Sequence, residues 1–255
     1  MANLTLRLPL ELKDKVKEAL LELGFSERYV PNTFWSLTDG KTYLNLYTSG
    51  VLLFQGEGAK EVFGLVSSMI GMPKGVMVGC DEAGKGEVFG PLVLCCSVIK
   101  PEYYTRVLSV SPTDSKRLED KKLLKKAELL EGFVEHYCRV VEPLELNILY
   151  EEIKNYNRLL DRFYRELLEA LFEKYPDAEF YIDAYSHTNP FGSKVVFKTK
   201  GEENLAVAVS SILARAKYLK WLYEKNLPKG SDLSLARKVP KERAKELLKV
   251  FFLEG

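Results

Sequence analysis

The chain has 255 residues, of which 46% are hydrophobic and 29% charged, and its formal net charge is +1. This length can bury the core of one large domain or of two unequal domains. The small net charge excludes a uniformly basic nucleic-acid-binding protein, so any phosphate contact must come from a local cluster. No apolar run is long enough to span a membrane and no signal-peptide pattern opens the chain, so we expect a globular cytoplasmic protein.

The first 70 residues predict a small α+β domain. Apolar side chains recur at helical spacing before Gly24, which suits a helix C-cap, and aromatic and β-branched runs separated by Asp-Gly and Ser-Gly pairs indicate strands. The predicted elements are a helix over 9–23, strands over 33–38, 42–47 and 51–55, and a helix over 60–70. Residues 71–76 have the composition of a linker, so the first domain is expected to cover 1–70.

The second predicted strand has two chemically different faces. Alternation places Leu44 and Leu46 on one face, which suits a core, and Tyr43, Asn45 and Tyr47 on the other. Tyrosines and an amide could stack on bases or sugars and bond to a nucleic-acid backbone. Because tyrosine is also a good strand former, an ordinary solvated face explains the pattern equally well. The sequence leaves both interpretations open.

Strands alternate with long helices in the rest of the chain, which indicates an α/β domain over 77–255. The predicted strands are 76–80, 91–99, 180–182 and 194–197, and the predicted helices are 118–132, 159–174, 205–225 and 240–252. The strands over 76–80 and 91–99 are almost continuously apolar, which is typical of strands buried on both faces.

The four cysteines show no C-x-x-C spacing, so neither a zinc knuckle nor a thioredoxin-like redox pair is indicated. They are Cys80, Cys95, Cys96 and Cys138. We expect small buried side chains. Their oxidation state stays open, because a single glutamine among abundant Lys and Glu is a bias of proteins from hot environments, where intracellular disulfides occur.

Carboxylates are the strongest candidates for chemistry. The only histidines are His136 and His187, which excludes a histidine-rich metal site and leaves little for a serine or cysteine triad. Asp81 and Glu82 follow one apolar strand directly, and Asp183 follows another. Acids gathered at neighbouring strand ends repel one another unless cations bind between them.

Oxygen ligands of this kind favour Mg²⁺ or Mn²⁺. Two such ions, about 3.5–4 Å apart, can activate a water and stabilise the leaving oxygen in phosphodiester hydrolysis. The alternative is that the acids only cap strands or pair with lysines. Two adjacent acids directly after a buried strand favour the metal site.

Three motifs resemble those of type 2 ribonucleases H. They are GCDEAGKG at 79–86 with FGPLV at 89–93, TDSK at 113–116, and SILAR at 211–215. Two features resemble the HIII branch of that family. One is the N-terminal domain, which is similar to a TATA-binding-protein-like module, and the other is LPKG at 227–230.

The resemblance implies a catalytic quartet that binds two divalent ions, Mg²⁺ or Mn²⁺. Asp81, Glu82 and Asp183 match its first three members. Glu202 follows a lysine and a small residue, as the family pattern requires, and is the predicted fourth member. Its spacing to the SILAR motif is one residue shorter than expected, so Glu203 remains an alternative.

The resemblance also implies substrate contacts. Gly84, Lys85 and Gly86 match the loop that contacts the ribose 2′-hydroxyl, the group that distinguishes RNA from DNA. Ser115 and Lys116 match positions that contact backbone phosphate.

The implied fold is a ribonuclease H-like α/β domain, with a mixed sheet flanked by helices, after a TATA-binding-protein-like α+β domain that binds the hybrid. The implied activity is endonucleolytic hydrolysis of the RNA strand of RNA/DNA hybrids, leaving 5′-phosphate and 3′-hydroxyl ends. We expect a monomer whose partner is this hybrid and not a membrane. Two alternatives stay open: ribonuclease HII-like nicking at single ribonucleotides in DNA, and a non-catalytic hybrid-binding protein.

Overall fold

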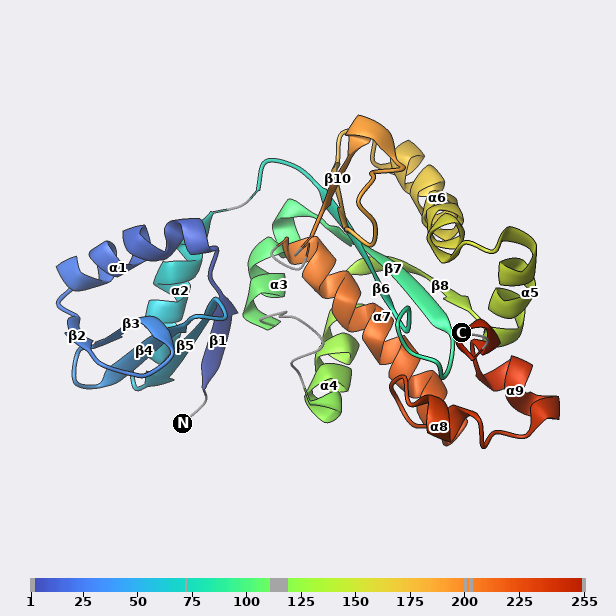
Figure 1. Ribbon diagram of the computed structural model, residues 1–255. Coiled ribbons are helices and arrows are strands. Elements are labelled where there is room, and N and C mark those ends of the chain that lie inside the picture. Colours follow the sequence, from blue (N-terminus) through green and yellow to red (C-terminus); the bar gives the residue numbers. More distant parts are fainter. Residues whose placement is uncertain (1–2, 72, 111–118, 200, 202–203, 254–255) are drawn as a thin grey trace. The chain divides into compact units, whose positions relative to one another are not determined.

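The computed structural model describes residues 3–71, 73–110, 119–199, 201 and 204–253 (Figure 1). It divides into two compact units, Met1–Lys74 with Lys100–Thr113, and Gly75–Ile99 with Asp114–Gly255. The boundary after Lys74 lies in the predicted linker. Residues 100–113 group with the first unit, although the sequence predicted them in the second domain. The predicted division into domains over 1–70 and 77–255 remains a prediction.

The first unit contains an antiparallel sheet of five strands in the order β1-β5-β4-β3-β2. Its strands are β1 (Leu4–Arg7), β2 (Ser26–Arg28), β3 (Thr33–Thr38), β4 (Thr42–Tyr47) and β5 (Val51–Gly56). Its helices are α1 (Lys13–Glu22), after a 3-10 turn at Leu10–Leu12, α2 (Ala59–Ile70) and α3 (Tyr104–Val110), after a 3-10 turn at Pro101–Tyr103. The three predicted strands and two predicted helices are confirmed. The sequence missed β1, β2 and α3, which are only three to seven residues long and carry weak periodicity.

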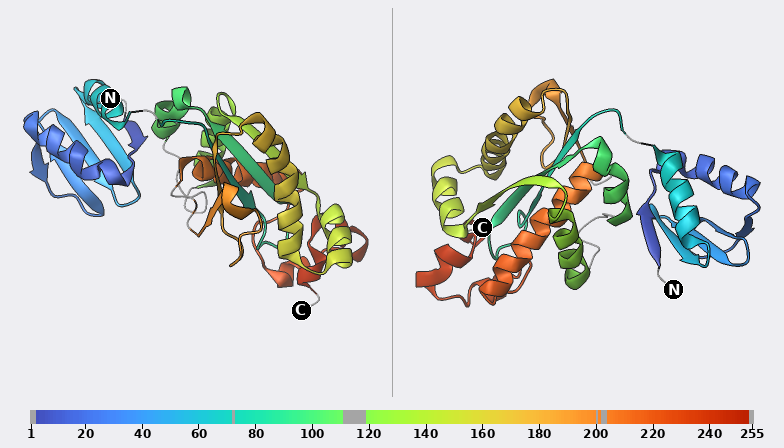
Figure 2. Two further views of the ribbon diagram at one scale, coloured as in Figure 1. Left: turned by 90° about the horizontal axis from the view of Figure 1, so that it is seen from above. Right: turned by 180° about the vertical axis from the view of Figure 1, so that it is seen from behind.

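Helices α1 and α2 cover the same face of this sheet (Figure 2). Trp35 and Phe54 pair in register with the two core leucines of β4, so they share one face. The indole Nε1 of Trp35 donates to the carbonyl oxygen of Lys13 in α1, at 3.1 Å, and the Phe54 ring meets Phe63 of α2 edge-on. The face that carries Tyr43 is therefore not covered by α1 or α2.

The second unit contains a mixed sheet of five strands in the order β10-β9-β6-β7-β8. β10, β9 and β6 are parallel, and β7 runs antiparallel to both of its neighbours. The strands are β6 (Met77–Ala83), β7 (Leu92–Ile99), β8 (Glu135–Val141), β9 (Glu179–Asp183) and β10 (Val195–Lys198). The helices are α4 (Asp120–Glu131), α5 (Pro143–Ile153), α6 (Tyr156–Lys174), α7 (Leu205–Glu224), α8 (Leu233–Ala236) and α9 (Lys241–Leu247), with 3-10 turns at Gly192–Lys194 and Val250–Phe252.

Helices α6 and α7 pack on opposite faces of the mixed sheet. The apolar stripe of α6 packs in one core cluster with Val78, Cys80 and Ile182. On the other face, Gly79 lets α7 come close, because a Cβ at this position would lie 2.2 Å from the backbone nitrogen of Val207. Gly79 therefore sets the distance between β6 and α7.

The predicted helix over 240–252 is wrong in its second half. α9 ends at Leu247, and Leu248 is extended and forms a bridge with Phe89. The sequence also missed β8 and α5. Most residues of β8 are only partly buried, so its hydrophobic pattern is weak. No helix in the described part of the chain is long and apolar enough to cross a membrane.

Two disulfides cross the mixed sheet. Cys80 in β6 bonds to Cys96 in β7, and Cys95 in β7 bonds to Cys138 in β8. Each bond joins residues that lie directly opposite in the antiparallel ladder. The expected burial is confirmed for Cys80, Cys95 and Cys96. The sequence left the oxidation state open, and in the structure all four cysteines are paired.

We expect reduction of these disulfides to destabilise the protein. The bonds close loops of 16 and 43 residues, for which loop entropy corresponds to roughly 3 and 4 kcal/mol. Thermal unfolding with and without a phosphine reductant should show a lower Tm in the reduced protein. A variant with all four cysteines replaced by alanine should not respond to the reductant. Four free thiols in unreduced, denatured wild type would contradict the pairing.

Candidate active site

Asp81 and Asp183 lie at the carboxyl ends of neighbouring parallel strands. The β6–β9 register pairs Cys80 with Ile182, and each aspartate is the next residue along its strand. Both line one cavity of about 470 Å³ together with Glu82. The structure therefore brings together the three acids that the sequence singled out at strand ends.

The adjacent acids of β6 point to opposite faces of the sheet because side chains alternate along a strand. Asp81 points toward α7, where Ser211 hydrogen-bonds to its carboxylate. Glu82 points toward α6, where the hydroxyl of Tyr164 donates to its Oε2 at 2.5 Å. The two helices that sandwich the sheet thus each hold one of the paired acids.

The environment of Asp81 disfavours its charged form. Burial raises the pKa of this carboxyl group well above its usual value, and the charges of Glu82 and Asp183 raise it further. The hydrogen bond from Ser211 and the backbone N–H of Glu82, which donates to Oδ1 at 2.8 Å, act in the opposite direction. A positive charge in the cavity would remove this penalty.

Two tyrosines and a lysine surround Glu82. The Tyr164 ring stacks on the ring of Tyr185, whose hydroxyl donates to Asp161 at 2.6 Å. Lys85 donates to the carbonyl oxygen of Tyr185 at 3.1 Å, and its Nζ lies 3.9 Å from Oε1 of Glu82. Burial raises the pKa of Tyr164 well above its usual value, as do the nearby carboxylates, so its hydroxyl remains a donor.

The loop after β6 has a backbone that requires glycine at its start. Gly84 has φ +83°, and a Cβ there would lie 2.3 Å from the carbonyl oxygen of Pro91. Gly86 is different, because it is exposed, has no positive φ, and has open space where a Cβ would be. Lys85 and both glycines line the same cavity as the acids.

The other predicted site residues of the second unit lie outside the described residues. They are Ser115, Lys116, Glu202 and the alternative Glu203. Within the described ranges, no group of three or more His, Cys, Asp or Glu side chains is arranged to hold a metal ion. Gly201 directly precedes Glu202, and its N–H donates to Oδ1 of Asp183 at 2.8 Å. The chain therefore passes Asp183 immediately before the predicted fourth acid.

Sequence reasoning assigned no role to several side chains in or beside the cavity. Ser211 and Arg215 belong to the SILAR motif, and both line the cavity. The carboxylate of Glu87 accepts from Arg215 and from the Tyr218 hydroxyl. The i, i+4 spacing of Ser211 and Arg215 on a predicted helix was the signal that placed both on one face.

The open face of the first unit holds the other predicted binding residues. Tyr43 is exposed and Tyr47 is partly buried, whereas Asn45 is buried and its Oδ1 has no hydrogen-bond partner among the described residues. Arg28, which the sequence analysis did not single out, places its guanidinium 5.0 Å from the centre of the Tyr43 ring.

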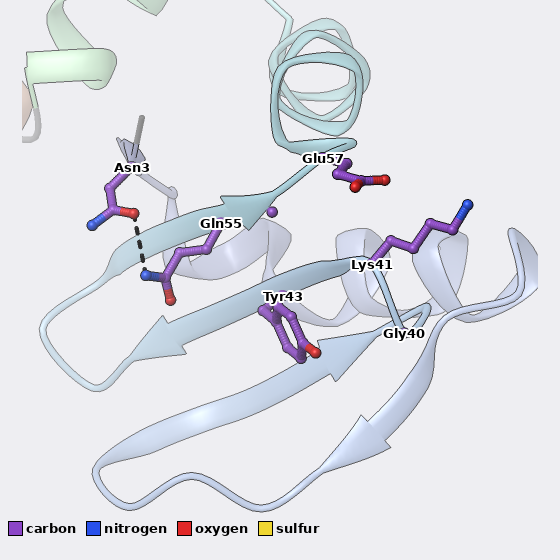
Figure 3. Close-up of a pocket in the computed structure, with 7 residues that line it drawn as sticks. Asn3, Gly40, Lys41, Tyr43, Gln55 and Glu57 are labelled. Atoms are coloured by element: carbon purple, nitrogen blue, oxygen red, sulfur yellow. Dashed lines mark hydrogen bonds between the residues drawn. The ribbon is translucent and has the colours of Figure 1, made fainter. Parts of the chain in front are cut away.

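A shallow pocket of about 400 Å³ adjoins Tyr43 (Figure 3). Gln55 faces Tyr43 from the neighbouring strand, and its amide donates to Oδ1 of Asn3 at 3.2 Å. Lys41 reaches out from the turn before β4. The pocket is lined by Asn3, Gly40, Lys41, Tyr43, Gln55, Gly56 and Glu57.

A mixed sheet with acids at adjacent strand ends, and with a long helix on each face, defines a ribonuclease H-like nuclease domain. A sequence model of the family described as Ribonuclease HII matches residues 78–251. Ribonuclease HIII of Aquifex aeolicus is 38% identical over 92% of this chain and 88% of its own. Ribonuclease HIII of Lactococcus lactis subsp. lactis is 30% identical over 89% of this chain and 84% of its own.

Solved structures of similar proteins point to the same family. The crystal structure of Aquifex aeolicus RNase H3 is 36% identical, covers 97% of this chain and 99% of its own, and has a TM-score of 0.64. Bst-RNase HIII in complex with Mn²⁺ is 19% identical, covers 98% and 96%, and has the same fold with a TM-score of 0.63. The chain therefore belongs to the type 2 ribonuclease H family, in its ribonuclease HIII branch. The predicted fold class, including the TATA-binding-protein-like first domain, is confirmed.

We expect Tyr164→Phe to weaken the site without unfolding the protein. The variant removes only the hydroxyl that orients Glu82, and loss of such a supporting hydrogen bond typically costs roughly 10–100-fold in metal affinity or activity. The assay is the rate of hybrid cleavage as a function of Mg²⁺ concentration. Tyr181→Phe is a matched control, because its hydroxyl donates to the exposed Glu179. An unchanged Mg²⁺ requirement and rate in Tyr164→Phe would contradict the role given to this hydroxyl.

Proposed function

We propose that this protein is an endonuclease that hydrolyses the RNA strand of RNA/DNA hybrids by a two-metal-ion mechanism, leaving 5′-phosphate and 3′-hydroxyl ends. The observation that carries the proposal is the cavity in which Asp81, Glu82 and Asp183 meet the loop of residues 84–86. Family membership supports the ribonuclease H activity. The choice of metal, the end chemistry and the cytoplasmic location are part of the proposal.

The acids fit divalent cations. Their donor set consists of carboxylate oxygens, which Mg²⁺ and Mn²⁺ prefer, and the repulsion at Asp81 is relieved by added positive charge. Asp81, Glu82, Asp183 and Glu202 would hold the ions. When bound, such a pair of ions supplies an activated water and charge stabilisation at the leaving oxygen. The Mn²⁺ complex of Bst-RNase HIII supports this assignment.

The chain's own residues orient this arrangement. Ser211 holds the Asp81 carboxylate, Tyr164 holds that of Glu82, and the Gly201 N–H holds that of Asp183. Fixing each carboxylate before substrate arrives reduces the reorganisation needed in the transition state.

The loop after β6 is suited to recognising the ribose of the RNA strand. Neither backbone conformation nor packing requires glycine at position 86, because a Cβ there would meet open space. The lack of a side chain at Gly86 leaves room for a sugar to approach the backbone, where N–H and C=O groups can bond to a 2′-hydroxyl. Lys85 adds a positive charge beside the acids. Ser115 and Lys116 are proposed to contact backbone phosphate.

The open face of the first unit is proposed to bind the hybrid. Tyr43 offers an exposed ring, and Arg28 and Lys41 offer cations beside it. Tyr47 and Asn45 lie on the same face along β4, where Tyr47 is partly buried and the side chain of Asn45 is buried. A sheet with aromatic and cationic groups on one uncovered face suits contacts to sugars and phosphates.

The reaction is tested by incubating a uniform RNA/DNA hybrid with wild type and with Asp81→Asn, in Mg²⁺ and in EDTA. We expect wild type to cut only the RNA strand, only with metal, and to leave 5′-phosphate ends. Asp81→Asn should lose at least roughly 10²-fold in rate, because it removes a charged ligand. Hybrid binding without any cutting would instead support a non-catalytic binding protein, and efficient nicking at a single ribonucleotide in DNA would support the HII-like activity.

We expect Tyr43→Ala to weaken hybrid binding and leave kcat unchanged. Loss of an aromatic platform costs about 1–3 kcal/mol per stacked base, which corresponds to a Kd at least roughly fivefold higher. Binding is measured in an Asp81→Asn background so that the hybrid stays intact. Tyr29→Ala is the control, because Tyr29 is 89% exposed and directly follows β2. Equal weakening by both variants, or by neither, would exclude a specific role for Tyr43.

A further inference from the structure

The segment after the 84–86 loop is paired with the C-terminal end of the described chain. The N–H of Gly90 donates to the carbonyl oxygen of Leu247 at 2.9 Å, and the N–H of Lys249 donates to that of Val88 at 2.9 Å. These two bonds lie on either side of the bridge between Phe89 and Leu248. The path from the loop back to β7 is therefore set by residues more than 150 positions later in the chain.

The side chain of Lys249 is the centre of this contact. It is 0% exposed, and its Nζ lies 2.8 Å from the carbonyl oxygen of Glu87 and 2.7 Å from that of Gly90. A third carbonyl oxygen, that of Phe89, lies at 3.4 Å. An ammonium group has three N–H donors and no acceptor, so its charged form matches three converging oxygens.

The backbone of Lys249 is itself fixed on both sides. The buried side chain of Asn147 in α5 donates through Nδ2 to the carbonyl oxygen of Leu248 at 2.7 Å. Its Oδ1 accepts from the N–H of Val250 at 3.0 Å. The backbone of Lys249 is therefore fixed, so its side chain contacts the 87–90 segment from a defined position.

Glu87 connects the same segment to the acid cavity. Besides Arg215 and Tyr218 of α7, its carboxylate accepts from the N–H of Gly230 at 2.8 Å. Glu87 and Arg215 both line the cavity, and α7 also carries the serine that bonds to Asp81. Lys249 thus binds the backbone of the 87–90 segment, and α7 binds the side chain of Glu87 in the same segment.

We propose that Lys249 is a positioning residue that fixes the 84–86 loop for the RNA strand by holding the carbonyl groups of Glu87 and Gly90. This inference rests on the proposed function, because the loop matters only if it contacts substrate. In the described part of the chain, the side-chain hydrogen bonds of Lys249 go to backbone carbonyl oxygens and not to Asp81, Glu82 or Asp183. Its effect passes through the backbone from residue 87 back to residue 86.

The protonation of Lys249 is tied to the same contact. Burial lowers the pKa of Lys249 to about 7, and the negative charge of Glu87 opposes this shift. Among the described residues, Glu87 is the charged group that faces the lysine, and Arg215 and Tyr218 bind its carboxylate on the other side. Below pH 7 the charged amine holds the three oxygens with three donors. Above pH 7 it loses one donor, so the loop is held less tightly.

The first test compares Lys249→Met with Lys245→Met, a control at an exposed lysine of α9. We expect Lys249→Met to lower kcat for hybrid cleavage by roughly tenfold, because even a small displacement of the 84–86 loop misplaces the RNA strand for reaction. The KM should change less than about threefold. The control should match wild type. The ratio of wild-type to Lys249→Met kcat should shrink as the pH rises from 6 to 8.5. An unchanged kcat, or a ratio that does not depend on pH, would overturn the inference.

A second measurement keeps the native side chain and does not depend on the variant folding. The pKa of Lys249 is followed by NMR of ¹³Cε-labelled lysine in Asp81→Asn protein, with and without the uncut hybrid. By linkage, a hybrid that requires the held loop must raise this pKa. Equal pKa values in the free and bound protein would overturn the inference. If wild type does not cut hybrids, the proposed function fails, whereas normal cutting with an unchanged Lys249 pKa removes only the role of Lys249.

Discussion

Repulsion among carboxylates held at the ends of β6 and β9 is the constraint on which the second unit depends. Parallel pairing places Asp81 and Asp183 next to each other, and Glu82, the next residue of β6, lines the same cavity. Burial and these charges raise the pKa of Asp81, so its charged form is disfavoured. The favourable free energy that keeps the acids together must therefore come from the surrounding fold.

That support is distributed over both layers that sandwich the sheet. The apolar stripe of α6 packs in a single core cluster and also delivers Tyr164 to Glu82. On the other face, Gly79 allows α7 to lie against the backbone of β6, which brings Ser211 to Asp81. Two disulfides link β6 through β7 to β8, and one of them starts at the residue before Asp81. The same contacts that stabilise the sheet thus orient the acids.

Sequence patterns predicted what depends on local order. Most of the long elements were found because their periodicity is strong, although the 11-residue helix α5 was missed. Asp81 and Asp183 were found because each directly follows an apolar run in the sequence. The bond between Tyr164 and Glu82 joins residues 82 positions apart, and no local pattern encodes it. Lys249 was placed inside a helix because the apolar spacing of the region resembles helical spacing, whereas pairing with the 87–90 segment makes this stretch extended. The cysteine pairing depends on strand register, which the sequence did not define.

The 84–90 segment combines fixed ends with an unobstructed middle. Its ends are fixed, because Gly84 and Gly90 both have positive φ and tight surroundings: a Cβ at either position would lie within 3 Å of Pro91 or Leu222. Its exposed middle at Gly86 has no such neighbour. If this loop contacts the ribose as proposed, rigid ends with an unobstructed centre favour discrimination by shape, because a backbone that cannot move penalises a sugar that lacks the matching hydroxyl. The contacts from residues 247–249 to residues 87–90 and the hydrogen bonds to the acids therefore meet one requirement. In the proposed function, the groups that contact the substrate must be in place before it arrives.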